Sequence, residues 1–399
     1  MARKDTALEE VSGLFQQTFA EKSALRSLSM LDVVAWGRLR AQHKKAFYEC
    51  LASLPPANAP EDARRLDDLL YCLPYARAAY GFAMYMGYLE TPLQCALLPV
   101  DAVTQGFDAR VADANTQLAS LCELCGRQRS DVILSSFDAS TFRPAFAVLV
   151  DADARTIVVT IRGSLHVEDV LTDVAAGVDE DPDLGGAVHA GILRSAKWVV
   201  ARVQPALRAQ KEERPHYRIV VTGHSLGAGV AALTALLLDS ALDAEAFVFA
   251  CPSVADPAVS KSPRAQARVT NVVHGRDWIP RLSVKSVQAV LHDVSMLGLQ
   301  TLAVDAVGKI AGGRVRDYAE RRKLPPETAA LQLPVGATFW VVDINKDAGA
   351  RVLRAEPEHF GSVFVHEKMF ADHLPSRYET GLRAVCAARG VRASAGAAL

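Results

Sequence analysis

One segment, YRIVVTGHSLGAGVAALTALLL, constrains the fold more than any other part of the chain. It contains the pattern G-x-S-x-G from Gly223 to Gly227, with Ser225 at its centre. A β-rich run ends at Thr222, and a helix rich in Ala and Leu begins directly after Ser225. This order of strand, sharp turn and helix is typical of a nucleophile elbow, in which a strained turn lifts the serine oxygen out of a sheet. The alternative is an ordinary buried strand–helix junction that happens to contain a serine.

The region after about residue 130 alternates predicted strands with helical stretches. Two apolar runs at 146–150 and 156–161 flank DADAR and predict a hairpin. Further strands are expected at 218–222, 246–250, 269–274 and 338–344, with a helix over 226–239. Strands separated by helical stretches favour an α/β fold with a mostly parallel central sheet covered on both faces.

The sequence before residue 130 is helical in its pattern of apolar residues. Helical spacing runs over 8–51, the loop LASLPPANAPED interrupts it, and the spacing resumes over 63–98. We therefore divide the chain into an N-terminal helical extension (1–60), an α/β domain (61–385), a helical insert within that domain (282–325) and a disordered tail (386–399).

Composition excludes several classes of protein. The 399 residues carry 44 basic and 45 acidic side chains, so no basic surface for nucleic acid is indicated. Seven cysteines are too scattered for a disulfide scaffold, and the C-x-x-C at Cys122 and Cys125 lacks the second ligand pair of a zinc site. No uncharged apolar run reaches the roughly 20 residues that span a bilayer, and the charged start MARKDTALEE is unlike a signal peptide. We expect a cytoplasmic protein that contacts membranes only peripherally.

A serine nucleophile needs a base and an orienting acid, which follow it in the order Ser, Asp, His on this kind of fold. Asp277 comes directly after the predicted strand 269–274 and is the first candidate for the acid, with Asp256 as the runner-up. His373 is the preferred base, because it lies late enough to return to the sheet edge. The other histidines considered for the base are His292, His359 and His366. His224, next to the nucleophile, is assigned a structural role.

Several ordered stretches carry a family resemblance: TIVVTIRGSLHVEDVLTDV, VHAGILRSAKWV, TGHSLGAGVAALTALLL, GRDWIPRLSV and MFADHLPSRY. With them the chain resembles the class 3 (fungal-type) lipases, and more closely the catalytic region of the sn-1-specific diacylglycerol lipases. The resemblance implies an α/β-hydrolase fold with Ser225 as nucleophile, Asp277 as acid and His373 as base. It also implies an oxyanion hole formed by Ser164, in IRGSL, and by the backbone N–H of Leu226.

The resemblance brings two further expectations. Related diacylglycerol lipases respond to calcium, yet the acidic loop DEDPDLG departs from an EF-hand in its glycine, its proline and its missing twelfth-position glutamate. The chemistry itself needs no metal or organic cofactor. The membrane-spanning helices of the animal enzymes have no counterpart here, so a peripheral membrane or lipid-droplet contact is expected instead, through the apolar stripe and arginines of the insert.

We therefore interpret the chain as a serine lipase that hydrolyses an acyl ester of glycerolipids, converting diacylglycerol to monoacylglycerol and a fatty acid. One alternative is a carboxylesterase or phospholipase of the same fold. The other is a lipase-like signalling module without catalysis. Asp169 and Asp173, after the oxyanion turn, are given no catalytic role.

Overall fold

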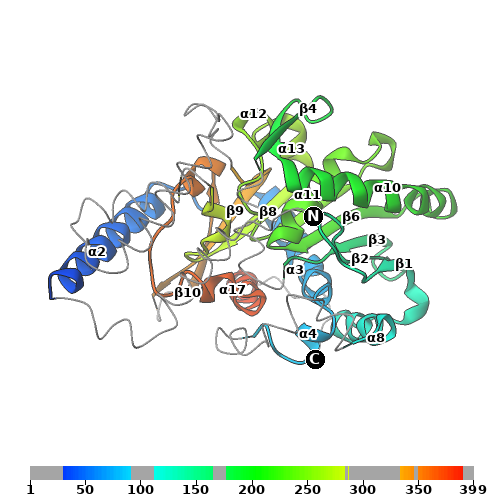
Figure 1. The fold of residues 1–399 in the computed structure, drawn as a ribbon, viewed down its shortest axis with the longest axis horizontal. Coiled ribbons are helices and arrows are strands. Elements are labelled where there is room, and N and C mark those ends of the chain that lie inside the picture. Colours follow the sequence, from blue (N-terminus) through cyan, green and yellow to red (C-terminus); the bar gives the residue numbers. More distant parts are fainter. Residues whose placement is uncertain are drawn as a thin grey trace, which may run out of the picture.

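The computed structural model describes residues 30–90, 112–164, 177–283, 286, 333–345 and 349–389. An eight-stranded sheet with the order β1-β2-β3-β6-β7-β8-β9-β10 forms its centre (Figure 1). Its strands are β1 Val132–Ser136, β2 Phe146–Asp151, β3 Thr156–Ile161, β6 Arg218–His224, β7 Glu245–Phe249, β8 Val269–His274, β9 Ala337–Asn345 and β10 Gly349–Ala355. Strands β3, β6, β7, β8 and β9 are parallel to one another, and antiparallel pairs close both edges.

Helices cover both faces of this sheet. On one face, α10 (Ala190–Glu213) and α11 (Leu226–Leu237) pack on strand residues such as Ile219 and Val221. On the other face, α3 (Pro60–Ala78), α8 (Ala114–Cys125) and α17 (Pro375–Ala388) pack on residues such as Val220. Successive residues of β6 thus enter opposite cores, which is the alternation that a strand imposes on its side chains. The arrangement is an α/β-hydrolase fold.

Shorter elements complete the described chain. A hairpin of β4 and β5 precedes α10, and a short turn of helix, α4, follows α3. The remaining short elements are β4 Val178–Asp181, β5 Gly186–His189, α4 Phe82–Tyr85, α12 Pro257–Ser260, α13 Pro263–Arg268, η2 Arg129–Asp131, η3 Ser240–Leu242, η4 Ile279–Arg281, η6 Pro357–Phe360 and η7 Ala371–His373. In the part of the chain that the structure describes, we find no helix with the length and apolar character of a bilayer span.

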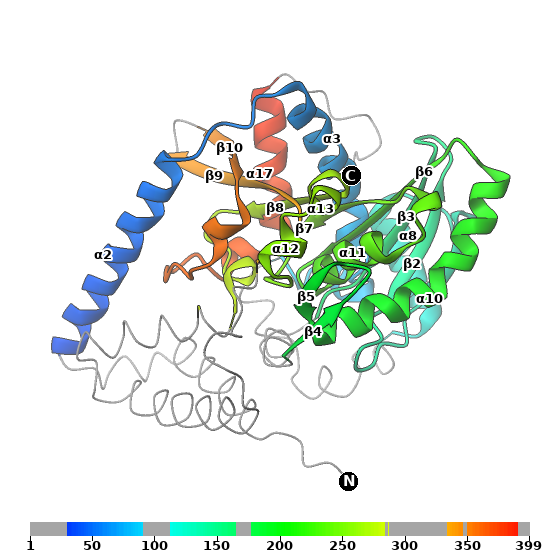
Figure 2. The ribbon, with the colours of Figure 1, turned by 90° about the horizontal axis from the view of Figure 1, so that it is seen from above.

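The first described helix, α2 (Met30–Ala52), extends away from the sheet and touches it only near its C-terminal end (Figure 2). There the Phe47 ring packs edge-to-face on Trp340 and Phe364, with 5.5 Å between ring centroids in each pair. The guanidinium of Arg276 lies 4.2 Å from the centre of the Phe47 ring. The helix therefore contacts both the loop after β8 and the irregular segment 361–374.

Most strands predicted from the sequence appear within a residue or two of their expected bounds, and the predicted mostly parallel sheet is confirmed. The disordered tail was predicted to begin at residue 386, but α17 continues to Ala388 and Cys386 is buried in the core. The helix expected over 63–98 ends at Ala78, and Gly81, with φ +56°, separates it from α4. Most of the insert at 282–325 lies outside the described residues, as do Asp169 and Asp173.

Candidate active site

Ser225 occupies a sharp turn between β6 and α11. Its φ of 60° and ψ of −131° lie in a region that residues with side chains rarely adopt. A Cβ on Gly223 would lie 2.5 Å from the Gly227 carbonyl oxygen, and one on Gly227 would lie 2.4 Å from the Ile161 carbonyl oxygen. Both glycines are thus required by close backbone approach, and the turn has the geometry of a nucleophile elbow.

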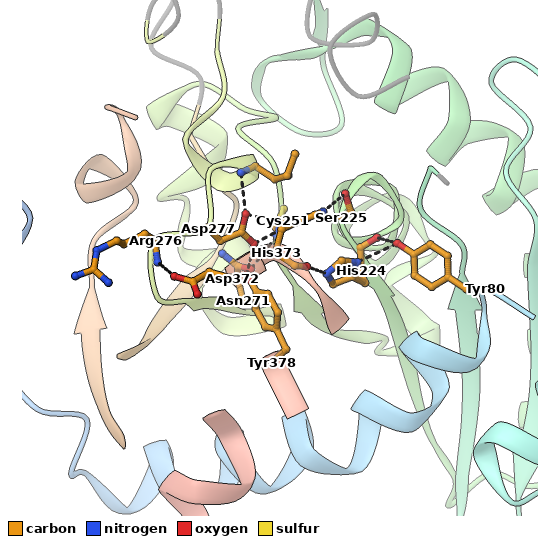
Figure 3. A network of polar contacts seen from close by, with 11 residues as sticks. Tyr80, His224, Ser225, Cys251, Asn271, Arg276, Asp277, Asp372, His373 and Tyr378 are labelled. Carbon is orange, nitrogen blue, oxygen red and sulfur yellow. Dashed lines mark hydrogen bonds and ion pairs between the residues drawn. The ribbon is translucent and has the colours of Figure 1, made fainter. Parts of the chain in front are cut away.

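Ser225, His373 and Asp277 form one chain of hydrogen bonds (Figure 3). Nδ1 of His373 lies 2.9 Å from Oδ2 and 3.1 Å from Oδ1 of Asp277, and Nε2 of His373 lies 3.0 Å from Oγ of Ser225. A carboxylate only accepts hydrogen bonds, so Nδ1 carries the ring proton and Nε2 is left to accept from the serine hydroxyl. The structure therefore brings together the three residues that the sequence singled out.

Asp277 is fully buried, yet both of its carboxylate oxygens have donors beyond the histidine. Oδ1 accepts from the backbone N–H of Ile279 at 2.9 Å, and Oδ2 accepts from the hydroxyl of Tyr378 at 2.5 Å. Burial and the adjacent Asp277 charge raise the pKa of Tyr378 well above its ordinary value, which keeps the phenol protonated as a donor. These contacts orient the carboxylate toward the imidazole ring.

His373 lies in segment 361–374, called the base segment below, which contains only short 3₁₀ turns. The carboxylate of the preceding residue, Asp372, accepts from the backbone N–H of Arg276 at 2.8 Å. Gly275 has φ +51°, and a Cβ there would lie 2.4 Å from Asp372 Oδ2. Burial raises the pKa of Asp372 above its ordinary value. Asp372 thus ties the base segment to the loop that bears Asp277.

His224 is buried beside the base. Its Nδ1 lies 2.9 Å from the hydroxyl of Tyr80, and its Nε2 lies 2.8 Å from the backbone oxygen of His373. The two imidazole rings are 4.7 Å apart between centroids. Burial, and secondly the nearby His373, hold the pKa of His224 well below its ordinary value, so the ring is neutral.

The turn after β3 lies directly against the nucleophile. A Cβ on Gly163 would lie 2.4 Å from the His224 carbonyl oxygen and 3.3 Å from Ser225 Cβ. Ser164 follows in this turn, and Leu226 is the first residue of α11, where backbone N–H groups lack partners within the helix and attract negative charge. Leu226 therefore adjoins Ser225 in the chain, and Ser164 follows Gly163, which lies against the elbow. Their role as donors of the oxyanion hole stays a prediction.

The other candidates of the sequence lie elsewhere. The Asp256 carboxylate caps α12 and accepts from the backbone N–H groups of Ala187 and Val259, each at 2.9 Å. His359 bonds to the backbone of Glu356, and His366 accepts from the Lys368 N–H. His292 lies outside the described residues.

Asp181 of the acidic loop and the two cysteines of the C-x-x-C pattern have other surroundings than a metal site. The Asp181 carboxylate of the acidic loop pairs with Lys197 at 2.6 Å and accepts from the backbone N–H groups of Asp183 and Leu184. Cys122 and Cys125 are both buried in α8, and burial raises the pKa of Cys125 to about 12. Within the described ranges, no three His, Cys, Asp or Glu side chains are grouped to hold a metal ion.

Three residues of the network were not predicted from the sequence, namely Tyr80, Asp372 and Tyr378. Tyr80 belongs to an aromatic stretch whose pattern fits an ordinary core helix, and Tyr378 lies in a helix that was not predicted. Asp372 offered one usable signal, because an acidic residue directly before a candidate base is a natural tether for its turn. Their roles arise from contacts between segments far apart in the chain.

Comparison with known proteins bears on this geometry. Residues 158–287, which include most of β3, the elbow and Asp277, match the model of the family described as "Lipase (class 3)". This segment matches the class 3 lipase family. The resemblance to class 3 lipases that we stated from the sequence is thereby confirmed for residues 158–287. His373 lies after the last matched residue.

Two relatives extend the match over more of the chain. Diacylglycerol lipase-beta of Mus musculus is 33% identical over 307 residues, which are 71% of this chain and 44% of that protein. Diacylglycerol lipase-alpha of Homo sapiens is 26% identical over 258 residues, which are 57% of this chain and 24% of that protein. The chain thus spans less than half the length of either relative.

Among solved structures, the native Rhizomucor miehei lipase propeptide complex is similar with a TM-score of 0.47 and 18% identity. The match covers 81% of this chain and 84% of that one.

Proposed function

We propose that the protein is a serine-dependent lipase that hydrolyses an acyl ester of glycerolipids, with diacylglycerol as substrate and monoacylglycerol and a fatty acid as products. The observation that carries the proposal is the hydrogen-bonded chain from Ser225 Oγ through His373 to the buried Asp277, beginning at a strained elbow. A serine hydroxyl at its ordinary pKa is a poor nucleophile, and this arrangement supplies the base that it needs.

In the acylation step, Ser225 Oγ attacks the ester carbonyl carbon while His373 Nε2 takes the hydroxyl proton. The imidazolium that forms is stabilised by the Asp277 carboxylate at Nδ1, and the Ile279 N–H and the Tyr378 hydroxyl hold that carboxylate in place. The carbonyl oxygen becomes an oxyanion, for which the N–H groups of Ser164 and Leu226 are the proposed donors.

Collapse of this intermediate breaks the bond between the acyl carbon and the glyceride oxygen. His373 gives its proton to that oxygen, so the alcohol leaves as neutral monoacylglycerol and the acyl group stays on Ser225. A water molecule then attacks the acyl-enzyme with His373 again as the base, which releases the fatty acid and restores the serine. The cycle balances without a redox partner, and we propose that it needs no metal or organic cofactor.

The class of substrate is supported by the relatives, whose names describe diacylglycerol lipases. Substrates of this class reside in lipid surfaces, so we propose that the protein reaches them as a peripheral protein. The cytoplasmic location and the calcium response expected from the sequence stay predictions.

The decisive experiment has two arms on the purified chain. Labelling by a fluorophosphonate probe tests for an activated serine, and Ser225→Ala is the matched negative control. Hydrolysis of diacylglycerol, triacylglycerol, phosphatidylcholine and a short soluble ester then ranks substrates. We expect labelling that Ser225→Ala abolishes, and the highest turnover on diacylglycerol.

Other outcomes separate the alternatives. No labelling and no hydrolysis of any ester would contradict the enzyme and favour a non-catalytic module. Labelling with faster turnover of phosphatidylcholine or the soluble ester would keep the serine hydrolase and replace its substrate.

A further inference from the structure

The adjacent residues His224 and Ser225 both bond to His373, one to its backbone oxygen and the other to its imidazole ring. Ser225 Oγ bonds to the ring nitrogen Nε2 at 3.0 Å, and His224 Nε2 bonds to the backbone oxygen of the same residue at 2.8 Å (Figure 3). Two adjacent residues of the elbow thus fix two points of one residue that lies 148 positions away. The two hydrogen bonds and the peptide bond between His224 and Ser225 form a closed ring, which fixes the distance between Ser225 Oγ and His373 Nε2.

The hydrogen-bond donors in this ring follow from elementary chemistry. The backbone oxygen of His373 can only accept, so Nε2 of His224 must carry the ring hydrogen. A neutral imidazole has one such hydrogen, which leaves Nδ1 of His224 as an acceptor. The Tyr80 hydroxyl, 2.9 Å away, therefore donates to Nδ1 and selects the tautomer that can hold His373.

The contact of His224 matters because His373 lies in a short turn before α17 and not within a strand or an α-helix. His373 ends the 3₁₀ turn η7, and the base segment lacks both strand and helix ladders along most of its length. A short irregular segment gains its precise position from side-chain contacts rather than from repeating backbone bonds. The neutral state of His224 also leaves the neighbouring imidazolium without a repelling charge during the reaction.

We propose that His224 is a positioning residue that holds the catalytic base through its backbone carbonyl, with Tyr80 fixing the required tautomer. This inference rests on the proposed function, because it concerns the step in which Ser225 gives its proton to His373. His224 is buried and both of its ring nitrogens bond within the protein, so we expect it to act on turnover rather than on substrate binding.

A matched pair of substitutions tests this. In His224→Gln the side-chain amide nitrogen reaches the place of Nε2 and can still donate to the His373 carbonyl. In His224→Asn it reaches only the place of Nδ1, beside Tyr80, so the carbonyl loses its donor. We expect His224→Gln to keep kcat within about tenfold of wild type, and His224→Asn to lose about 10²-fold in kcat, with KM unchanged in both.

Two further variants complete the experiment. Tyr80→Phe removes the donor to Nδ1 and is expected to lower kcat about three- to tenfold. His216→Gln, the same change at an exposed histidine between α10 and β6, is the control and should leave kcat unchanged. The rate of fluorophosphonate labelling should fall in the same order as kcat.

The outcomes are distinguishable. If wild type hydrolyses esters and His224→Asn, folded by circular dichroism, does so within threefold of wild type, the positioning role is wrong while the lipase stands. Equal losses in His224→Gln and His224→Asn would also overturn it. If wild type neither labels nor hydrolyses, the proposed function itself fails.

Discussion

The two sides of the candidate site are built in different ways. On the nucleophile side, β6, the elbow and α11 are continuous in sequence, and backbone contacts at Gly223 and Gly227 fix Ser225. On the base side, the base segment is irregular and is attached by side chains from distant parts of the chain, among them His224 and Asp372. We therefore expect that adding a methyl group at the elbow glycines disturbs the nucleophile side. Removing a polar side chain that bonds to the base segment should disturb the base side.

The largest effect is expected from Ser225→Ala, which removes the reacting oxygen and leaves the elbow backbone in place. Turnover should fall about 10⁴- to 10⁶-fold, because attack without the hydroxyl is left to water. Activity on a short nitrophenyl ester and the free energy of unfolding measure the two effects separately. Residual activity near wild type would show that another residue is the nucleophile.

Asp277→Asn is the corresponding change on the base side. An amide in place of the carboxylate can hold the imidazole in the wrong tautomer and stabilises its charged form less, so kcat should fall about 10⁴-fold. In the variant the amide oxygen can still accept from the Ile279 N–H, while the NH₂ group then faces His373 Nδ1 and the Tyr378 hydroxyl, where the carboxylate accepted. A loss below tenfold would contradict the role of Asp277.

Gly227→Ala tests the nucleophile side by addition of a single methyl group. That methyl would lie 2.4 Å from the Ile161 carbonyl oxygen and 2.7 Å from the Gly163 nitrogen, both of which are backbone atoms. We expect a loss of about 1–3 kcal/mol in the free energy of unfolding, measured by urea denaturation. The control is Gly361→Ala in the base segment, where φ is −72° and suits any residue. Equal losses at the two positions would remove the distinction between the two sides.

The smallest effect concerns the pH dependence of stability through His224. Its folded pKa is held well below the ordinary value of 6.5, mainly by burial. As pH falls below 6.5, the unfolded chain binds a proton that the folded chain does not, so this residue destabilises the fold at acid pH by up to about 1.4 kcal/mol per pH unit.

His224→Gln removes that titration and should flatten the loss of stability between about pH 7 and pH 5. Other titrating groups are shared by the two chains, so their difference isolates His224. Urea unfolding of both chains across this range is the measurement. Parallel pH profiles would mean that the folded protein protonates His224 as readily as the unfolded one.

The same contrast explains what could be predicted from the sequence. The elbow and the central strands are encoded locally, so the G-x-S-x-G pattern and its flanking runs sufficed to place Ser225. Asp277 and His373 were predicted from chain order and from their places after predicted strands, and the family resemblance agreed with that choice. The contacts of Tyr80 and Asp372 join segments that no local pattern relates, and α17 was not predicted because its first turn follows directly from the irregular base segment.

The helix α2 adds an outer support to the base segment. Its His43 ring accepts from the backbone N–H of Val365 at 2.9 Å, its Arg40 pairs with Glu367, and Phe47 packs on Phe364. The boundary predicted near residue 60 therefore separates two stretches of sequence, but the helix before it packs on the domain after it. A chain that begins after α2 would keep every proposed catalytic residue, but the base segment that carries His373 would lose its contacts with this helix. Loss of activity in such a truncated chain would therefore not contradict the triad.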